Sequence, residues 1–496
     1  MNAIVKLGDY PELDQHPSIG KVKRVLEWWA SSEPFRKLIA EDPLEAARRY
    51  DLGFDPQAIR ALWDPLFARD AREQGRAVDP AVAAYHKFFG DKTIWRGQVK
   101  EECTPSDPRF AAWRARQISR NVMENGGYDD YIIHTPFAIE TTEGCSVQCW
   151  FCGVGATKVA NSFLYTPENA ALWRECLTVL HNKIGPASKW GFLYWATDPL
   201  DNPDYELLAS DFCDIIGMYP QTTTAQAHKH VERVRKLLKV SEARGCRVNR
   251  FSVLTEALLR RIYKAFTADE LTNVEIVAQM NDSTTAKAAA GAFRQRAKTK
   301  RQLIDTETRK LERLAEISNL VAGNEEKKAP PQPGTIACVS GFLLNMVTRT
   351  IKLISPCRAS EEWPLGYVVF DQRSFNDAME LEDHVEAMMA EHMPVKIDLK
   401  DRIRFNPNFR YQKHEDGFHV VSAMNELSFR RADMADYVLS LGDQVNSGRR
   451  TAAQIALSGF FEHGVPEANT IGTLEALFQR GLLVDARGRI SGERTM

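Results

Sequence analysis

The segment that decides the fold reads Thr141-Thr142-Glu143-Gly144-Cys145-Ser146-Val147-Gln148-Cys149-Trp150-Phe151-Cys152-Gly153. Its three cysteines are spaced C-x3-C-x2-C, directly after an apolar stretch that is typical of a strand. Three thiolates this close in sequence can converge on one metal centre, and the two glycines permit the tight turns that convergence needs. We therefore predict a metal site in the loop that follows a strand.

The number of ligands separates two candidate metals. A structural zinc site takes four protein ligands, but no fourth cysteine lies nearby, and the closest histidine, His134, is upstream within the expected strand. Three cysteines that hold a four-iron cluster leave one iron open to an exogenous ligand, as a catalytic cluster requires. The residues favour the cluster, and zinc is the alternative.

This spacing, with an aromatic residue directly before the last cysteine, resembles the radical S-adenosylmethionine (SAM) superfamily. The resemblance implies an α/β fold, a partial (β/α)6 barrel, with a [4Fe-4S] cluster held by Cys145, Cys149 and Cys152 after the first strand. It implies SAM on the open iron, cleaved by electron transfer to methionine and a 5′-deoxyadenosyl radical. An electron donor such as flavodoxin or ferredoxin is then an expected partner.

The same resemblance implies contacts to SAM at strand ends. Phe151 would lie against the adenine. The family usually has Gly-Gly-Glu-Pro after the second strand, and the matching place here reads Ala196-Thr197-Asp198-Pro199, so Asp198 supplies the carboxylate although both glycines are missing. Ser252, after the fourth strand, and Gln279, after the fifth, occupy the places of ribose and adenine contacts. Ordinary polar strand ends explain these two residues equally well.

Alternating apolar and amphipathic stretches predict a parallel α/β layer from about residue 130. The expected strands are Tyr131 to Thr141, Trp190 to Thr197, Gln221 to Gln226, Val248 to Leu254, Val274 to Met280 and Ile336 to Leu344. Thr166 ahead of Pro167 predicts a helix start, and Thr267 with Glu270 fits a capping box. Residues 294–328 read as a charged helical insertion, either an exposed helix with a solvated face or a basic lip that attracts an acidic peptide.

The patterns divide the chain into four parts. Residues 1–110 are expected to be a helical N-terminal region, residues 111–375 the barrel with its insertion, and residues 376–414 a connecting segment. Residues 415–496 predict a winged-helix-like module, with a capping box at Thr451 and Gln454. This module resembles the element that captures leader peptides by strand addition in enzymes that modify ribosomal peptides. The alternative, that both terminal regions brace the barrel and cover its open side, explains them equally well.

Several longer stretches resemble a narrower group, the radical SAM epimerases of the proteusin (polytheonamide) type. They are the cysteine segment Gly144-Cys-Ser-Val-Gln-Cys-Trp-Phe-Cys-Gly153, Tyr194-Trp-Ala-Thr-Asp-Pro-Leu-Asp-Asn-Pro-Asp-Tyr205, Pro220-Gln-Thr-Thr-Thr-Ala-Gln226, Thr335-Ile-Ala-Cys-Val-Ser-Gly341 and Lys352-Leu-Ile-Ser-Pro-Cys357. The resemblance implies conversion of L- to D-residues in a precursor peptide with a leader and a core. The adenosyl radical would remove the α-hydrogen, and a cysteine thiol on the opposite face would return a hydrogen.

Such an enzyme needs a free thiol apart from the cluster. Cys357 follows Ser355-Pro356 at a strand exit, so its side chain is expected to aim at the substrate. Cys338 lies within the sixth expected strand and is the alternative, although packing explains it as well. The other cysteines (Cys103, Cys176, Cys213 and Cys246) are interpreted as core residues.

Composition limits the remaining possibilities. The chain has 496 residues and a formal net charge of −2, which gives no reason to expect nucleic acid or a membrane surface as partner. No apolar run approaches the ~20 residues of a membrane span, and Met1 to Gln15 does not read as a signal peptide, so a cytoplasmic protein is expected. No C-x-x-C pair lies outside residues 145–152, so one cluster per chain is expected.

Two rival functions stay open on the sequence. A radical SAM enzyme that forms thioether or carbon–carbon crosslinks would use the same cluster. A non-enzymatic metal-binding adaptor would use the C-terminal module to hold a peptide.

Overall fold

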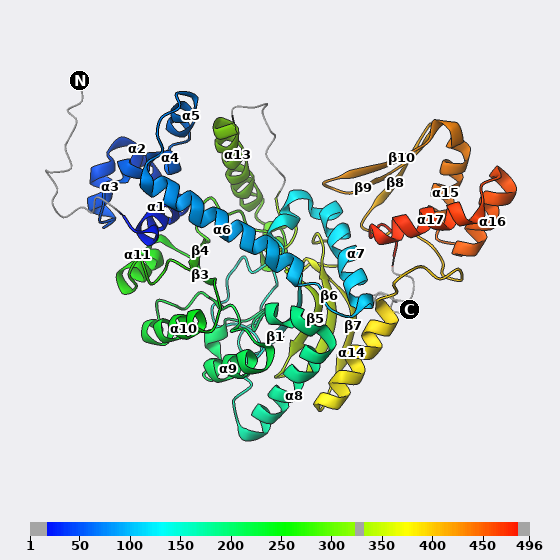
Figure 1. Cartoon of the computed structure of the whole chain (residues 1–496), viewed down its shortest axis with the longest axis horizontal. Coiled ribbons are helices and arrows are strands. Elements are labelled where there is room, and N and C mark those ends of the chain that lie inside the picture. Colours follow the sequence, from blue (N-terminus) through cyan, green and yellow to red (C-terminus); the bar gives the residue numbers. More distant parts are fainter. Residues whose placement is uncertain (1–16, 323–331, 485–496) are drawn as a thin grey trace.

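The structure is a computed structural model that describes residues 17–322 and 332–484. The expectations for Met1 to Gln15 and for the end of the insertion, residues 323–328, lie outside the described residues. Figure 1 shows N-terminal helices at one end, a central group of strands with helices around it, and a C-terminal module at the other end. No helix in the described part of the chain is long and apolar enough to cross a membrane.

The N-terminal region is helical, as predicted. Its helices are α1 (Ile19–Ser31), α2 (Glu33–Glu41), α3 (Pro43–Arg49), α4 (Arg60–Trp63), α5 (Pro65–Glu73), α6 (Pro80–Glu102) and α7 (Pro108–Asn125). Asp-Pro pairs begin several of them, because the aspartate side chain accepts a backbone N–H of the first turn and proline needs no partner there. The aromatic rings of Trp28, Phe35 and Tyr50 pack together and join the main core.

Two sheets form the central part. The first has the order β1-β5-β6-β7, from β1 (Thr135–Glu140), β5 (Val339–Asn345), β6 (Thr350–Pro356) and β7 (Tyr367–Ser374). β1 and β5 are parallel, whereas the β5–β6 and β6–β7 pairs are antiparallel. The second sheet is parallel, from β2 (Thr223–Thr224), β3 (Asn249–Val253) and β4 (Val274–Ala278). The predicted α/β class is confirmed.

Two expected strands behave differently in the structure. The Trp190–Thr197 segment makes only a single parallel bridge, Ala138 to Phe192. Its irregular path fits the close approach of its backbone, because a Cβ on Gly191 would lie 2.2 Å from the Phe137 ring. The sixth expected strand, β5, returns to β1 instead of continuing beyond β4, and it thereby pairs one edge of β1. Sequence patterns do not encode such non-local pairing.

Helices cover the sheets on the outside (Figure 1). They are α8 (Pro167–Ile184), α9 (Tyr205–Ile216), α10 (Val231–Ala243), α11 (Glu256–Ala265), α12 (Gly291–Ala297), α13 (Gln302–Ala322) and α14 (Ala378–His392). Thr166 caps α8, as predicted, by accepting the N–H of Asn169. The opposite face of the first sheet carries a separate apolar cluster that includes Ala138, Val339 and Tyr367.

The insertion is α12 and α13, and α13 is not a wholly solvated helix. Its Glu307, Lys310 and Leu311 are buried. The Glu307 carboxylate accepts the backbone N–H of Lys287 at 2.7 Å, and Lys310 donates to the carbonyl of Met280 at 3.1 Å. One face of α13 therefore holds the segment that follows β4.

The C-terminal module has its own apolar core. It comprises β8 (Arg410–His414), β9 (Gly417–Val421) and β10 (Glu426–Arg430), followed by α15 (Ala435–Ser447), α16 (Ala452–His463) and α17 (Glu467–Gln479). The sheet is antiparallel with β9 in the middle. The predicted capping box at Thr451 and Gln454 is confirmed.

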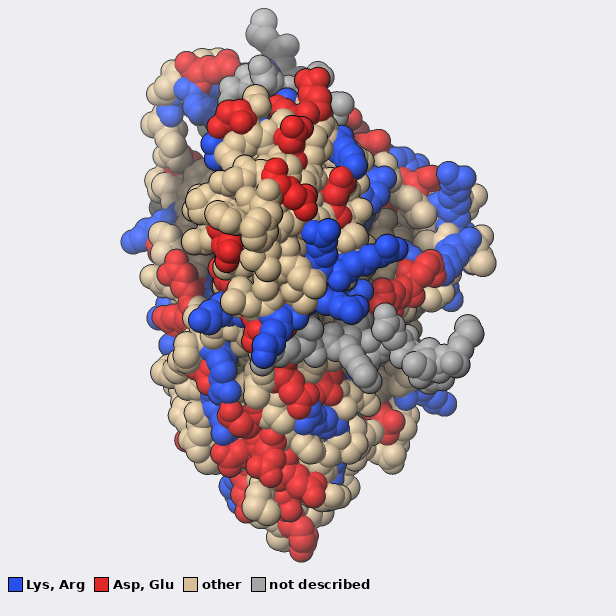
Figure 2. All heavy atoms as spheres, turned by 90° about the vertical axis from the view of Figure 1, so that its right-hand side faces the viewer, with Lys and Arg blue, Asp and Glu red and all other residues tan. Residues whose placement is uncertain are grey.

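Viewed from the side of this module, the lower part of the molecule is strongly acidic (Figure 2). Figure 1 places α14 there, and this helix carries five acidic residues in fifteen. α14 lies in the segment expected to be a connection, but it packs against α8, and its apolar side chains join the main core.

Candidate functional site

The cysteine loop leaves the carboxyl end of β1 and folds back on itself. The N–H of Glu143 donates to the carbonyl of Asn161 at 2.9 Å, and the N–H of Phe163 donates to the carbonyl of Thr141 at 2.8 Å. Gly144 has a φ of +79°, and a Cβ there would lie 2.3 Å from the carbonyl oxygen of Lys158. Only glycine fits this crossing, which fixes the start of the cysteine segment.

The three cysteines are free and half-buried. Burial, followed by the neighbouring Cys152 and Cys145 thiols, raises the pKa of Cys149 to about 12. Burial also raises the pKa of Cys145, against the backbone N–H groups of Val147 and Gln148 that favour its thiolate. The N–H of Ala156 donates to the Cys152 sulfur at 3.3 Å. Backbone N–H groups therefore point at the sulfurs of Cys145 and Cys152 and would stabilise their thiolate forms, which are the forms that bind a metal.

The donor set fits a cluster better than a single ion. A tetrahedral zinc with Zn–S bonds of about 2.3 Å holds its sulfurs about 3.8 Å apart. In the described part of the chain, the three sulfurs do not form a group within 4.8 Å of one another. Three soft ligands at this wider spacing suit a four-iron cluster with one open iron.

Asp198 lies at the exit of the Trp190–Thr197 segment and is 4% exposed. Its carboxylate accepts hydrogen bonds from the Thr224 hydroxyl at 2.8 Å, the Ala225 N–H at 2.8 Å and the Leu200 N–H at 3.1 Å. Burial raises its pKa against these donors. The chain's own donors therefore occupy the carboxylate, which joins two segment ends close to the cysteine loop.

A second carboxylate links the cysteine loop to β2. Asp201 accepts the N–H of Ser146 and the side-chain amide of Gln226, both at 2.8 Å. Glu140, the last residue of β1, accepts the N–H of Ala196 at 2.8 Å, and burial raises its pKa. Neither residue can be predicted as part of the site from the sequence, because single polar residues at strand ends carry no pattern of their own.

Phe151 lies in an aromatic and cationic group. Its ring meets Trp150 edge to face, and Trp150 stacks on Phe293 of α12. The buried Lys287 ammonium lies 5.3 Å from the centre of the Phe151 ring and 5.5 Å from that of Trp150. These contacts tie the cysteine loop to the segment after β4, on the side held by α13.

The other two expected SAM contacts lie on the parallel sheet. Ser252, on β3, pairs with Val277 of β4 and is half-buried. Gln279 directly follows β4, and its N–H donates to the carbonyl of Val253 at 2.8 Å. Both positions lie toward the carboxyl ends of parallel strands, where α/β proteins collect their sites.

Cys357 is not open to a barrel mouth as its sequence position suggested. It is 0% exposed, and burial raises its pKa well above the ordinary value, with Glu124 of α7 as the next cause. Arg120 of α7 donates to the adjoining Ser355 hydroxyl and Pro356 carbonyl. The thiol therefore lies on the side of the sheet that packs against α7.

Cys338 is the more accessible of the two thiols. It is half-buried directly before β5, and its thiol donates to the Ile336 carbonyl at 3.4 Å. Burial raises its pKa, while the nearby Arg250 and Arg96 act in the opposite direction. Its half-buried position is compatible with both interpretations of Cys338, as a packing residue and as a hydrogen donor.

A second group of potential metal ligands lies away from this loop. Carboxylate and imidazole atoms of Asp371, Glu391 and His392 lie within 4.8 Å of one another. The Arg373 guanidinium bridges the two carboxylates at 2.8 and 2.9 Å. A cationic side chain thus already offsets part of the negative charge of this cluster.

The uncharacterized protein y4wI of Sinorhizobium fredii (strain NBRC 101917 / NGR234) is 34% identical to this chain over 477 residues. The match takes in 95% of this chain and 88% of that protein. This chain belongs to the y4wI family. Because so little of the chain lies outside the match, the y4wI similarity spans the cysteine loop and the central sheets. No family model matches the chain.

One solved structure is a weak match. It is BtrN in complex with AdoMet and 2-DOIA, at 15% identity and a TM-score of 0.22, over 28% of this chain and 55% of that chain. At this TM-score, the match carries no argument about the fold or the chemistry.

Proposed function

We propose that this protein is a radical SAM enzyme that epimerises L- to D-residues in a ribosomally made precursor peptide. The observation that carries the proposal is the C-x3-C-x2-C loop at the carboxyl end of β1, whose half-buried Cys145 and Cys152 lie close enough to raise the pKa of Cys149. The first sheet, the Trp190–Thr197 segment bridged to β1 at Ala138–Phe192, and the parallel β2-β3-β4 sheet would together form the arc of a partial barrel. A cluster bound there would supply the reductive cleavage of SAM.

Around such a cluster, residues of this chain would hold the cysteine loop in place and enclose the bound SAM. Asp201 fixes the loop through the Ser146 N–H, and Asp198 fixes the adjoining segment end. Phe151, against the Lys287 ammonium, would cover the nucleotide side. Ser252 and Gln279 are the proposed polar contacts to the nucleoside.

A hydrogen-atom donor must be a protonated thiol. Burial raises the pKa of both Cys357 and Cys338, which keeps the S–H bond intact at neutral pH. We retain Cys357 as the proposed donor and Cys338 as the alternative. In the reaction the peptide α-carbon radical takes the sulfur-bound hydrogen and leaves a thiyl radical, which an external reductant must restore.

The test is turnover in deuterated water with SAM, a reductant and the precursor peptide encoded beside the gene. We expect D-residues that each carry one deuterium, because the thiol exchanges with solvent before it donates. Cys357→Ala should still cleave SAM but yield no D-residue, whereas Cys338→Ala should turn over normally; the reverse pattern identifies Cys338. Normal inversion in both variants, or a mass loss of two hydrogens that marks a crosslink, contradicts the proposal.

We further propose that the C-terminal module captures the precursor's leader as an added strand. Its order, three antiparallel strands and then three helices around a separate core, resembles a winged-helix-like recognition module. β10 and β8 are both edge strands. Edge strands present unpaired N–H and C=O groups to an incoming peptide.

The edge can be tested by proline substitution. The N–H of Arg431 donates to Asp416 across the hairpin, so by alternation the N–H of Ser428 points to the free edge of β10. The corresponding outward N–H of β8 belongs to Lys413. Ser428→Pro or Lys413→Pro should weaken leader binding at least about tenfold, and the affected variant identifies the edge. Unchanged binding in both variants contradicts strand addition.

A further inference from the structure

A cavity of about 460 Å³ lies at the end of the parallel sheet opposite the cysteine loop. Its wall includes Gln221, Val248 and Glu275, at or near the amino ends of β2, β3 and β4. α6 closes one side, with only Val82 and Val99 buried in this 23-residue helix. The volume is that of a small-molecule site.

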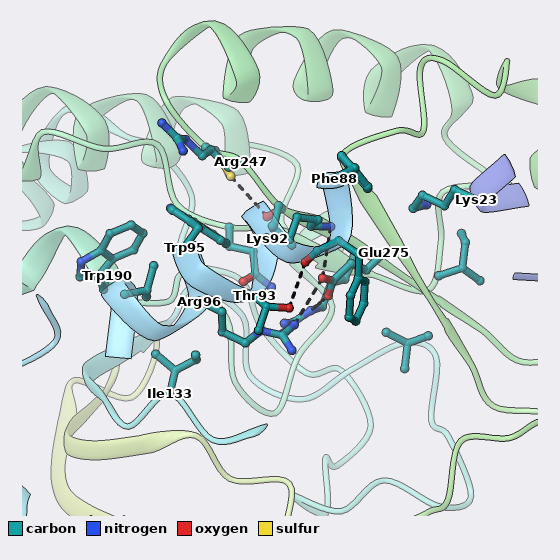
Figure 3. A pocket seen from close by; sticks show the side chains of 18 of the residues that line it. Lys23, Phe88, Lys92, Thr93, Trp95, Arg96, Ile133, Trp190, Arg247 and Glu275 are labelled. Atoms are coloured by element: carbon teal, nitrogen blue, oxygen red, sulfur yellow. Dashed lines mark hydrogen bonds and ion pairs between the residues drawn. The ribbon is translucent and has the colours of Figure 1, made fainter. Parts of the chain in front are cut away.

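The lining is aromatic around its rim (Figure 3). Trp95 of α6 and Trp190 meet edge to face, with ring centres 5.9 Å apart. Phe88 and Phe89 of α6 also line the cavity, and the Phe89 side chain is 61% exposed. These aromatic surfaces suit a ligand with a flat, apolar part.

Charge in the cavity is unbalanced. Six cationic side chains and two carboxylates line it, the cations being Lys23, Lys92, Lys189, Arg96, Arg247 and Arg250. Three of the cations share the single Glu275 carboxylate, Arg250 at 2.9 Å, Arg96 at 3.3 Å and Lys92 at 3.4 Å. Burial opposes ionisation of Glu275, but these cations outweigh it and lower its pKa to about 2. Glu275 therefore stays ionised and still leaves positive charge in excess.

We propose that this cavity binds a ligand with a carboxylate on an aromatic or apolar body, which Lys92 and Arg96 recognise. In Figure 3 both side chains project from α6 toward Glu275, beside Trp95. The carboxylate of such a ligand would pair with Lys92 and Arg96, which at present share the Glu275 carboxylate. The cavity is partly shielded from water, and this strengthens ion pairs. The site is separate from the cysteine loop, and its binding does not depend on the proposed reaction.

The probes are 2-naphthoate and its neutral amide, 2-naphthamide, titrated into the full-length protein by calorimetry and tryptophan fluorescence. The carboxylate should bind at least about tenfold more tightly than the amide. A capped hexapeptide with an internal Phe-Glu pair, against its Phe-Gln analogue, tells whether a peptide segment satisfies the same chemistry. Preference for the free carboxylate alone indicates a small-molecule ligand, and preference for the Phe-Glu peptide as well indicates a peptide.

Substitutions test whether the carboxylate binds at Lys92 and Arg96. Arg96→Gln with Lys92→Met should remove the acid-over-amide preference, whereas Lys37→Gln, at an exposed position of α2, should leave it unchanged. The acid and amide comparison on the unaltered protein stands by itself if the double variant fails to fold. Equal affinity of acid and amide, no binding of naphthoate, or an unchanged preference in a folded double variant would overturn the proposal.

Discussion

Asp198 shows how much depends on single acceptor atoms near the cysteine loop. Its carboxylate accepts two backbone N–H groups and one hydroxyl in a buried place. In Asp198→Asn the amide NH2 replaces one acceptor oxygen, so one of the N–H groups, of Leu200 or Ala225, loses its partner. We expect a loss of about 1–3 kcal/mol in the free energy of unfolding, measured by urea denaturation.

The matched control is Asp214→Asn, whose side chain is 62% exposed and pairs with Arg244 at the surface. That change should alter the free energy of unfolding by less than about 0.5 kcal/mol. Equal stability of Asp198→Asn and the unaltered protein would show that the hydrogen bonds of Asp198 add nothing to the fold.

At this scale, the sequence predicts residue types better than their orientation. The cysteine trio could be found because its ligands are local, within eight residues. The direction of the Cys357 side chain could not, because it depends on which face of β6 packs against α7. Asp201 and Glu140 escaped prediction because their partners come from other segments.

Among the elements, β1 is joined to its surroundings by a buried chain of hydrogen bonds. His134 contacts Asp129 through Nε2 and the Ser340 hydroxyl through Nδ1, both at 2.8 Å. His134 is buried and both its ring nitrogens are taken by side chains of this chain, so the group serves the fold. Burial lowers the pKa of His134 to about 4, against the Asp129 carboxylate that raises it.

This histidine predicts an acid-sensitive fold. Between pH about 6.5 and about 4, the unfolded chain binds a proton at this position and the folded chain does not. Stability should therefore fall as the pH falls through this range, by up to about 3 kcal/mol from this group. Urea denaturation at pH 7.5, 6 and 5 measures it, with His134→Gln as control. If His134→Gln keeps the full pH dependence, the assignment is wrong.

Helix α13 predicts a local effect on the segment after β4. Glu307→Gln weakens its hydrogen bond to the Lys287 N–H and its ion pairs with Lys287 and Lys310. Because the Glu307 charge supports Lys310, whose pKa burial lowers to about 8, that pKa should fall further. We expect faster amide hydrogen exchange in residues 279–291. Glu312→Gln, on the exposed face of α13, should leave the exchange unchanged, and equal exchange in both variants contradicts this role.

Capping signals were the most predictable feature at the scale of elements. Thr166 and Thr451 begin α8 and α16 as expected. Thr267 and Glu270 make the reciprocal bonds of a capping box, yet no helix follows them in the described structure. The motif stabilises a turn by the same hydrogen bonds, so it indicates a local geometry and not a helix length.

For the whole molecule, the sequence predicted the α/β class and the helical N-terminal region, but not the arrangement of the sheets. β5 is separated from β1 by about 200 residues and still pairs with it. The cavity under α6 is likewise built from α1, α6, β3, β4 and the segments that precede β2 and β3, and no local sequence pattern predicts this combination. The sheet arrangement and the cavity therefore depend on contacts between segments far apart in the sequence, which sequence patterns do not show.

The most direct measurement is iron content and SAM cleavage on anaerobically reconstituted protein under dithionite. The proposal predicts about four irons per chain, a brown chromophore and 5′-deoxyadenosine from SAM. Cys145→Ala, Cys149→Ala and Cys152→Ala should each abolish cleavage, whereas Cys213→Ala should not. Colourless protein that leaves SAM intact would contradict the account.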